Sequence, residues 1–517
     1  MVNGRTVADK SDRFATPLWT TESEGWQAIN DRLPADHLAR RIVDAVDMLD
    51  LGPLWGSYLG VGKKALPPDL LLKAVLYEMH SKRPSPAQWT TDARENEPVR
   101  WLLFGLEPSR AHWYDFRDRL APFWDGWNAH VLQQAIQEEM TTATRVAVDS
   151  STVAANASRR KLLNEEHLQQ RRQVIDEHLQ AVQRGETMTD EAPGWLAKSE
   201  AGLREQKQRY AHAAEIMRER QEANAQRRSD KRKPADQVRV SPADPAAVLA
   251  RDKEGVFRPL YMLQFVRDLD SPLIFAHDVL TQNNDNGVLE PMVERMVDSV
   301  GVKPKQIFVD SGYVSIRHLE FCDMAEITLY GPCQENDFSV ANGKKPQSNQ
   351  HTELPKSVFT WLPGEQTYRC PEGHRMEFTK TQTQQRVDHK ITLTVYTCPP
   401  EHCQACPRQP ACTRTPKKGR TVSRMQNEEL LDELRTRMET DEAKQLYKLR
   451  SRTVEQSFAD LKEHRGLRQF HCRGQRRVKA EVGSLVLTNN LVAVEQHCHQ
   501  RRQNLSEVNF AQTPCAT

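Results

Sequence analysis

The sequence predicts an α/β protein with a mixed β-sheet core, to which an all-helical N-terminal domain, a helical insertion and a small cysteine-rich insertion are added. Two apolar strand patterns, RVAVD and IFVD, each end at an aspartate and are separated by a predicted hairpin and a helix. This order of strands and helices is typical of an α/β sheet. A helical period fills residues 34–125 ahead of the first strand, and five of the ten cysteines fall between Cys370 and Cys412.

Composition narrows the class of protein. Of the 517 residues, 38% are hydrophobic and 27% are charged, which favours long solvated helices over one compact globule. The formal net charge is only +2, so a surface for a polyanion has to be local. No run of about 18 apolar residues predicts a membrane span, and the first residues lack the apolar core of a signal peptide. We therefore expect a cytoplasmic protein, in which clustered cysteines indicate a metal site.

Composition and periodicity divide the chain into six regions. They are an extended arm (1–33), a helix-turn-helix-like helical domain (34–125), the first part of the α/β core (140–333), a cysteine-rich insertion (334–425), the second part of the core (426–498) and a loose tail (499–517). Within the first core part, residues 158–233 form a polar helical insertion. Its residues fit either a coiled arm or a charged helical hairpin packed loosely on the body, and they favour the hairpin.

Short helical patterns with tight turns between them fill the N-terminal domain. Pro67 and Pro68 open one of these patterns, and Gly105 and Pro108 separate the last two. This arrangement fits a helix-turn-helix module, whose last helix reads DNA. The residues expected to project from the start of that helix are Ser109, Arg110, His112 and Trp113. An ordinary helical bundle is the alternative, because helix-turn-helix geometry is poorly specified by one sequence.

Three acidic residues are candidates for a metal-dependent site. Asp149 and Asp310 each end an apolar strand run and precede small polar residues, and strand ends are where sites gather in α/β sheets. Carboxylates on neighbouring strands repel each other unless cations bridge them, and such oxygen ligands suit Mg²⁺ or Mn²⁺. Two ions of this kind can polarise an attacking water and stabilise the oxygen that departs from phosphorus. Glu455 is the candidate third ligand.

Glu455 lies in a helical pattern whose apolar residues place it at the edge of the core. Val454, Phe458 and Leu461 form a stripe that would pack this helix on the sheet, and Lys462 shares the face of Glu455, where it could meet a phosphate. Nearby cations suited to bidentate phosphate contact include Arg450, Arg465, Arg468 and Arg473. Taken singly, each aspartate could instead be a turn or cap residue, and Glu455 could be a salt-bridge partner.

Together these motifs resemble those of bacterial insertion-sequence transposases of the DDE class, over about residues 35–495. VDSSTVAANAS resembles the first-aspartate motif of that family, and FVDSGYVSIRHLEF resembles the second. The segments RGLRQFHCRG and EVGSLVLTNNL resemble its C-terminal continuation. One set of residues resembles the tyrosine–arginine–glutamate–lysine signature around the catalytic glutamate, with one additional residue between the arginine and the glutamate: Tyr447, Arg450, Glu455 and Lys462.

The resemblance implies an RNase H-like core in which Asp149, Asp310 and Glu455 hold catalytic Mg²⁺ or Mn²⁺. It implies that water cleaves a phosphodiester at the end of a mobile element and that the freed 3′-hydroxyl then attacks target DNA. The partners would be double-stranded DNA, both as terminal inverted repeats recognised by the N-terminal domain and as target DNA. Because two DNA ends must be brought together, we expect a homodimer or a larger assembly on DNA, associated with the bacterial nucleoid.

The cysteine cluster predicts a structural Zn²⁺ site. Cys403 and Cys406 form a CxxC knuckle, Cys412 follows six residues later, and Cys370 lies upstream in YRCPEGH. Four thiolates from two loops give a closed tetrahedral site. The ligand set is not unique, and the alternative ligands are Cys398, His374 and His402. The resembled family carries a zinc ribbon at this place, and reduced cysteines without metal are the alternative.

Two other functions are compatible with these residues. One is a transposase-derived regulator that binds DNA with a catalytically silent site, although all three acids are present. The other is a structural zinc protein that scaffolds partners through the helices of residues 158–233. That second function predicts no affinity for DNA, even at low salt, where phosphate contacts bind most strongly.

Overall fold

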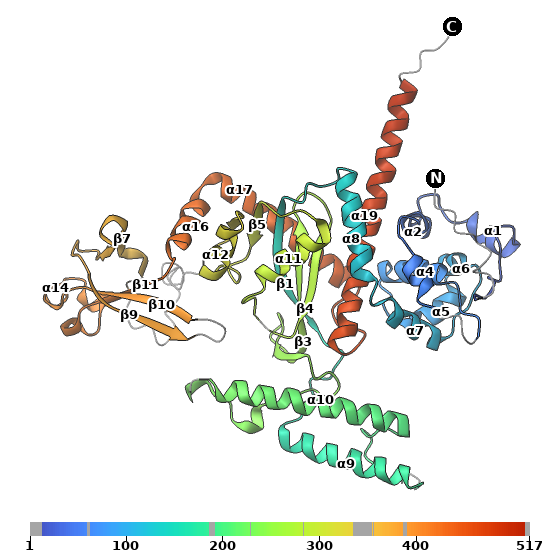
Figure 1. Ribbon diagram of the computed structural model, residues 1–517, viewed down its shortest axis with the longest axis horizontal. Coiled ribbons are helices and arrows are strands. Elements are labelled where there is room, and N and C mark those ends of the chain that lie inside the picture. The colour runs from blue at the N-terminus through green and yellow to red at the C-terminus, as the bar shows by residue number, and fades with distance from the viewer. Residues whose placement is uncertain are drawn as a thin grey trace. The chain divides into compact units, whose positions relative to one another are not determined.

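The structure is a computed structural model that describes residues 13–58, 63–185, 192–227, 229–282, 284–333, 354, 356–385 and 390–511. The chain forms two compact units, shown in Figure 1: unit 1 contains residues 1–305 and 449–517, and unit 2 contains residues 306–448. Helices and strands occur in both units, with antiparallel strand pairs in unit 1 and a parallel pair in unit 2. The predicted mixed α/β class is therefore confirmed. None of the described helices is long and apolar enough to cross a membrane.

Helices make up the N-terminal part of unit 1. They are α1 (Glu24–Asn30), α2 (Leu38–Val46), α3 (Gly52–Gly56), α4 (Pro68–His80), α5 (Pro86–Glu95), α6 (Glu97–Leu102), α7 (Arg110–Leu120) and α8 (Trp124–Gln137). The sequence predicted α2, α4, α6 and α7, but the extended arm is wrong where α1 forms. Trp26 of α1 stacks on Trp101 with ring centroids 5.4 Å apart, so the apolar ring gains cover by joining the domain. Residues 1–12 of the predicted arm lie outside the described residues.

The helical domain buries the carboxyl group of Glu78, and this burial gives the protein a predicted pH dependence. Glu78 is 1% exposed, and burial, followed by the nearby Asp92 carboxylate, raises its pKa from 4.5 to about 9. The folded chain therefore holds a proton that the unfolded chain releases above its lower pKa. The contribution of Glu78 to the free energy of unfolding is therefore fully present below about pH 4.5. It decreases as the pH rises toward 9, by at most about 1.4 kcal/mol per pH unit.

Glu78→Gln is expected to flatten this loss of stability, because an amide cannot ionise. Urea unfolding at about pH 4.5 and at about pH 9 would measure this change in the free energy of unfolding. The exposed Glu95→Gln on the neighbouring helix is the matched control and should keep the slope of the unsubstituted protein. An unchanged slope in Glu78→Gln would contradict the assignment.

Four strands that pair in antiparallel fashion form the part of the main sheet that belongs to unit 1. They are β1 (Arg145–Ala154), β2 (Val248–Arg251), β3 (Phe257–Asp268) and β4 (Ile274–Leu280). β3 pairs with each of the other three, and the predicted hairpin is the β3–β4 pair. Helix α11 (Leu289–Val300) follows and ends at Gly301, whose φ of +77° fits the predicted glycine stop. At its start, Val288 occupies the cap position without a side-chain hydrogen bond.

A long C-terminal helix, α19 (Gln475–Ala511), contacts α2, α4 and α8 on the helical side and β4 on the sheet side (Figure 1). Its middle is buried, as its apolar sequence predicted. Asn490 is 0% exposed there, and its side chain pairs with the backbone of the first residue of β4. Asn490 Oδ1 accepts from Ile274 N at 2.9 Å, and Asn490 Nδ2 donates to Ile274 O at 2.7 Å. The predicted loose tail is wrong as far as Ala511, because the helix continues through it. Residues 512–517 lie outside the described residues.

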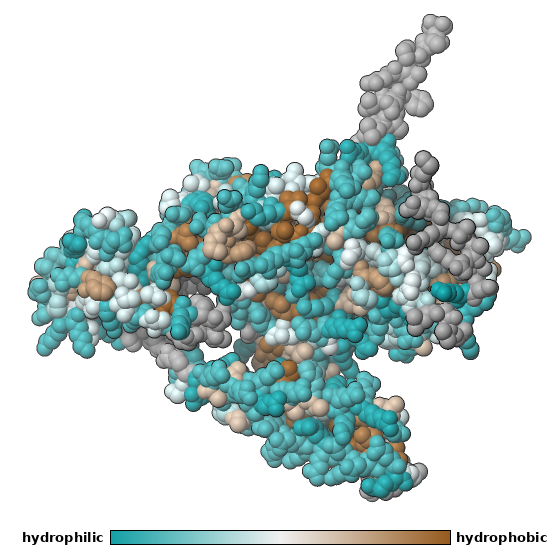
Figure 2. Space-filling model, in the orientation of Figure 1, coloured by the Kyte–Doolittle hydropathy of each residue, from teal (hydrophilic) through white to brown (hydrophobic). Residues whose placement is uncertain are grey.

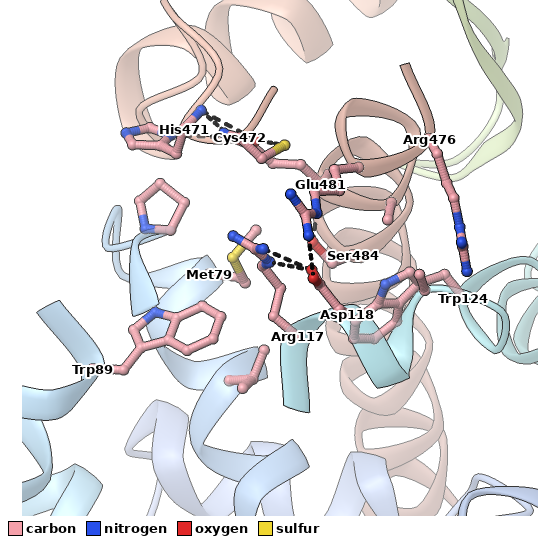
Figure 3. A pocket seen from close by; sticks show the side chains of 15 residues that line it. Met79, Trp89, Arg117, Asp118, Trp124, His471, Cys472, Arg476, Glu481 and Ser484 are labelled. Atoms are coloured by element: carbon pink, nitrogen blue, oxygen red, sulfur yellow. Dashed lines mark hydrogen bonds and ion pairs between the residues drawn. The ribbon is translucent and has the colours of Figure 1, made fainter. Parts of the chain in front are cut away.

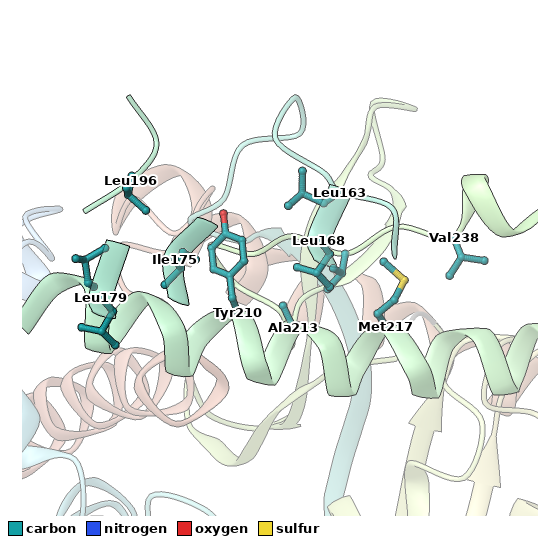
Figure 4. Packing of buried hydrophobic residues seen from close by; sticks show 11 residues of the cluster. Leu163, Leu168, Ile175, Leu179, Leu196, Tyr210, Ala213, Met217 and Val238 are labelled. Carbon is teal, nitrogen blue, oxygen red and sulfur yellow. The ribbon is translucent and has the colours of Figure 1, made fainter. Parts of the chain in front are cut away.

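The insertion is the predicted helical hairpin, made of α9 (Glu165–Gln183) and α10 (Glu200–Ala225). It has a small apolar core of its own, in which side chains of the two helices face each other (Figure 4). The labelled members of this core on the two helices are Leu168, Ile175, Leu179, Tyr210, Ala213 and Met217. The outer surface of the hairpin is mainly hydrophilic on the face shown in Figure 2. The few periodic apolar residues of this insertion are therefore enough for the two helices to bury them against each other.

Unit 2 begins with β5 (Gln306–Val309), α12 (Ile316–Met324) and β6 (Thr328–Tyr330), where β5 and β6 pair in parallel. The cysteine-rich part contains β7 (Thr360–Leu362), β8 (Thr367–Arg369), β9 (Glu377–Gln385), β10 (Lys390–Thr397), α14 (Pro400–Gln404), α15 (Gln409–Cys412) and β11 (Thr421–Met425). β9, β10 and β11 form a three-stranded antiparallel sheet. Residues 334–353, 355 and 386–389 of the predicted insertion lie outside the described residues.

The helical pattern that contains Glu455 does not form one continuous helix. Helix α16 (Glu429–Glu439) ends at Thr440, whose ψ of 145° is extended, and α17 (Asp441–Arg450) follows. After α17 come a π-helical turn (Ser451–Glu455), α18 (Gln456–Ala459) and a second π-helical turn (Asp460–His464). No proline or glycine marks these changes, so the helical period alone could not show them.

Candidate active site and thiol cluster

Asp149 lies in the middle of strand β1, and the prediction that the strand ends there is wrong. The ladder with β3 continues from Val146 to Ala154. Asp149 is opposite Phe265, which stacks on Phe458 of α18 with ring centroids 4.8 Å apart. Directly opposite residues of an antiparallel pair point to the same face of a sheet. Asp149 therefore points to the face that the Glu455 segment covers.

Glu455 lies at the edge of the core, as predicted. Val454, Phe458 and Leu461 are 0%, 8% and 2% exposed, whereas Glu455 is exposed. Glu455 is the last residue of the first π-helical turn, and a π turn contains one residue more than an α turn. This turn directly follows Arg450, so it joins Arg450 to Glu455. Such turns occur frequently at functional sites.

Arg450 compensates the charge of Asp149. Its Nη2 lies 2.9 Å from Asp149 Oδ2, and the two side chains are only 10% and 14% exposed. The other carboxylate oxygen, Oδ1, accepts a hydrogen bond from Ser150 N at 2.8 Å. The pair fixes the orientation of Asp149 and keeps its negative charge inside the protein. A cation that joined Asp149 would share the carboxylate with this guanidinium.

Lys462 is tied to the same strand. Its Nζ donates to Ser151 Oγ at 2.6 Å and to Thr152 O at 3.0 Å. Burial lowers the pKa of Lys462, and the nearby Lys253 lowers it further. Ser151 is two residues beyond Asp149 and so shares its face of the sheet. The structure thus brings Lys462, Arg450 and Asp149 together along β1.

Asp310 and Tyr447 belong to unit 2, whereas Asp149 and Glu455 belong to unit 1. Asp310 follows the last residue of β5, as predicted, and its Oδ1 accepts a hydrogen bond from Gly312 N at 2.8 Å. Tyr447 donates its hydroxyl to Val309 O at 3.0 Å. Tyr447 therefore holds the backbone where Asp310 leaves the strand, a role that its place in the sequence did not reveal.

The predicted DNA-reading residues of α7 divide into exposed and buried ones. Ser109 caps the helix, with its Oγ accepting from His112 N at 3.4 Å, and both Arg110 and His112 are exposed. Trp113 is 0% exposed and meets the ring of Trp89 edge-on, with centroids 5.6 Å apart. A DNA contact by Trp113 is therefore wrong, because the indole anchors α7 to α5.

The three predicted phosphate-binding arginines also differ. Arg465 is 7% exposed, and its Nε donates to Asp460 Oδ2 at 2.8 Å, so a surface role for Arg465 is wrong. Arg468 is exposed and forms an ion pair with Glu463. Arg473 is exposed and donates from Nε to Asn156 O at 2.9 Å. Charge and spacing in the sequence could not distinguish these environments.

Five cysteines of unit 2 line one small cavity and are called the thiol cluster below: Cys370, Cys398, Cys403, Cys406 and Cys412. The cavity has a volume of about 20 Å³, room for one water-sized species. His374 and His402 line it too, with their rings stacked 4.0 Å apart.

Cys398 has a more central place in the thiol cluster than its status as an alternative ligand indicated. Burial raises the pKa of its thiol, and hydrogen bonds with Cys403 and Cys370 raise it further. Arg420 N donates to Cys403 Sγ at 3.4 Å. Cys398 directly follows β10 and lies outside the CxxC knuckle, so sequence spacing gave it less weight.

The donor chemistry of the thiol cluster fits zinc. Among the residues that the structure describes, no group of three or more His, Cys, Asp or Glu side chains is arranged as a metal site. Buried thiols with raised pKa values nevertheless stay protonated unless a cation compensates the thiolate, and zinc does so. Cys370, Cys398 and Cys403 with one of the two remaining cysteines would provide four sulfur ligands.

Gly419 holds the backbone of the thiol cluster in place. Its φ is +76°, and a Cβ added there would stand 2.1 Å from the carbonyl oxygen of Cys398, whose N donates to Arg420 O at 2.8 Å. Gly419→Ala is therefore expected to lower thermal stability by more than the roughly 1–2 kcal/mol of left-handed strain. Gly373→Ala is the control, because its φ is +86° with no atom within 4 Å. Equal losses of stability in the two variants would contradict the clash.

A larger cavity of about 130 Å³ lies between α4, α5, α7 and the start of α19 (Figure 3). Arg117 and Arg477 both contact Asp118, at 2.6 and 2.8 Å, and His471 Nδ1 lies 3.0 Å from Glu481. Asp118 and Arg477 are 359 residues apart in sequence, so spacing did not link them. The pair between Asp118 and Arg477 fastens the start of α19 to the helical domain.

Comparison with known families adds one finding to this geometry. Residues 369–494 match the family described as Transposase DDE domain. The matched segment begins next to Cys370 and ends within α19, so it includes the thiol cluster and Glu455 but neither Asp149 nor Asp310. This transposase-domain match supports a DDE transposase with DNA as its substrate. No curated protein was found to match the chain.

Proposed function

We propose that this protein is the DDE transposase of an insertion sequence. It binds terminal inverted repeats, cleaves phosphodiester bonds at the ends of the element and joins the freed 3′-hydroxyls to target DNA. One observation carries the proposal: the transposase-domain match includes Glu455, whose segment covers the face of the sheet to which Asp149 points. The core is proposed to be RNase H-like, and the protein to act in the cytoplasm at the nucleoid as a dimer or larger assembly on DNA.

Asp149, Asp310 and Glu455 are proposed to hold Mg²⁺ or Mn²⁺, since carboxylate oxygens are the ligands these ions prefer. When bound, the ions would polarise the attacking water and stabilise the departing oxygen. Arg450 orients Asp149, and Tyr447 holds the strand end that carries Asp310. Lys462 has three N–H donors, two of which reach β1, and the third is proposed to contact a phosphate oxygen.

The other parts are given supporting roles. The N-terminal helical domain is proposed to contact the inverted repeats, with Ser109, Arg110 and His112 at the exposed start of α7. The thiol cluster is proposed to bind one structural Zn²⁺ and so to give the small sheet of β9, β10 and β11 a rigid neighbour.

A catalytically silent DNA-binding regulator is the second candidate. The ion pair between Arg450 and Asp149 favours it, because a guanidinium already compensates this carboxylate without a metal. Nicking of supercoiled plasmid in Mn²⁺ separates the two candidates. The transposase should nick the plasmid, and Asp310→Ala should abolish nicking. Equal nicking by both proteins, or none by the unsubstituted one, would overturn the proposed catalysis.

A further inference from the structure

A row of cations follows strand β1 away from the candidate active site. Lys462 is bound to Ser151 and Thr152, and the chain after it runs beside the end of the strand. Ala154 N donates to Arg468 O at 3.4 Å, and Phe470 N donates to Ala154 O at 2.9 Å. These backbone bonds keep residues 468–473 next to the strand as it leaves the sheet.

Arg473 is the next exposed cation along this path. Its Nε donates to Asn156 O at 2.9 Å, and Asn156 Nδ2 donates to His471 O at 2.8 Å. The reciprocal bonds fix Arg473 to the loop that follows β1. Arg468 is less available to an anion, since its guanidinium forms an ion pair with Glu463.

Three consecutive cations then continue the row. Arg159, Arg160 and Lys161 are exposed in the loop between β1 and α9. Within the described part of the chain, none of these three side chains has an ion pair or a hydrogen bond. The loop is anchored at its far end, where Leu163 and Val240 exchange two backbone hydrogen bonds of 2.9 Å. A run of exposed cations on anchored backbone creates a positive local potential that attracts anions.

We propose that these residues form a β1 cation track that binds the phosphates of duplex DNA on one side of the cleaved bond. The track consists of Lys462, Arg473, Arg159, Arg160 and Lys161. The five residue steps from Asp149 to Ala154 span about 17 Å at the rise of a β-strand. One strand of DNA advances about 3.4 Å per phosphate, so this length corresponds to about five base pairs before the three loop cations are reached. The placement of the cleaved bond at Asp149 rests on the proposed function.

The track predicts the salt dependence of DNA binding. Each phosphate neutralised by a cation contributes about −0.9 to the slope of log K against log salt concentration. The combined variant Arg159→Ala, Arg160→Ala, Lys161→Ala should therefore bind fluorescent duplex DNA with a slope shallower by about 2.7. The measurement uses the full chain and fluorescence anisotropy over a series of salt concentrations.

The matched control removes three cations from the opposite end of the same hairpin: Arg184→Ala, Lys198→Ala, Arg204→Ala. This control should keep the slope of the unsubstituted protein. If its slope became shallower by as much as that of the track variant, the change would reflect net charge alone and the proposal would be overturned. An unchanged slope in the track variant would also overturn it. Plasmid nicking tests the proposed function separately. If DNA binding depends on the track but nicking does not depend on Asp310, the proposed catalysis is refuted and the track is not.

Discussion

Glu455→Gln is expected to abolish DNA cleavage while the fold and DNA binding are kept. The glutamine has nearly the same shape but carries no charge to hold a divalent cation. Metal ions contribute several kcal/mol to such reactions, and each 1.4 kcal/mol is a tenfold change in rate, so the loss should be about 10³-fold or more. Glu455 is exposed, so its replacement should leave stability within about 0.5 kcal/mol.

The measurement is the rate of Mn²⁺-dependent plasmid nicking, with duplex binding recorded for the same preparation. Glu463→Gln is the matched control, because Glu463 is exposed in the same segment and its carboxylate forms an ion pair with Arg468 at the surface. We expect this control to keep nearly full activity. If Glu455→Gln nicked DNA as fast as the control, the candidate site would be wrong.

Asp149→Asn should behave differently from Glu455→Gln, although both remove a carboxylate. The ion pair with Arg450 is largely buried, and breaking such a pair by changing one partner costs about 3–5 kcal/mol. Loss of activity in Asp149→Asn alone would thus not separate catalysis from folding. A melting temperature that falls in Asp149→Asn but not in Glu455→Gln would support a buried environment for Asp149 and an exposed one for Glu455.

Removal of zinc is expected to have the largest effect on stability. Structural zinc contributes about 10–16 kcal/mol of apparent binding free energy, which is also folding free energy when the site does not exist in the unfolded chain. A chelator, or Cys398→Ser, should therefore unfold the region of the thiol cluster. Limited proteolysis should then cut within residues 356–425, and the metal content should fall from one zinc per chain to none.

Cys498→Ser is the control for this experiment, because Cys498 lies in α19 of unit 1, outside the thiol cluster. It should keep the zinc and the resistance to protease. Cys406→Ser and Cys412→Ser, compared in the same assay, should identify the fourth ligand beside the three proposed ligands Cys370, Cys398 and Cys403. A fully reduced, protease-resistant protein that contains no zinc would refute the metal site.

Local patterns predicted much of the fold. Pro68 at the start of α4 and Gly301 after α11 act within one turn of the backbone, so their sequence signals were sufficient. The end of β1 was misplaced because polar Asp149 and Ser150 were taken as the end of a strand. Pairing with β3 continues the strand past them, and that pairing depends on a segment more than a hundred residues later.

The candidate site was predicted in its residue types and not in its contacts. Arg465 and Arg468 look alike in sequence, but one pairs inside the protein with Asp460 and the other pairs at its surface with Glu463. Trp113 looked like a residue at the start of a reading helix, yet its large apolar ring is covered by Trp89. Burial is decided by the neighbours that a fold supplies, and these neighbours are not adjacent in sequence.

The sequence by itself determined the strand and helix patterns, the acidic residues and the cysteine-rich segment, because these depend on residue type and short-range spacing. Only the tertiary structure decided that Arg450 compensates Asp149, that Lys462 joins β1 and that Cys398 contacts two other thiols. The bond from Lys462 to Ser151 joins residues 311 positions apart. Such contacts form only when packing brings distant segments together, since hydrogen bonds and ion pairs act over a few ångströms.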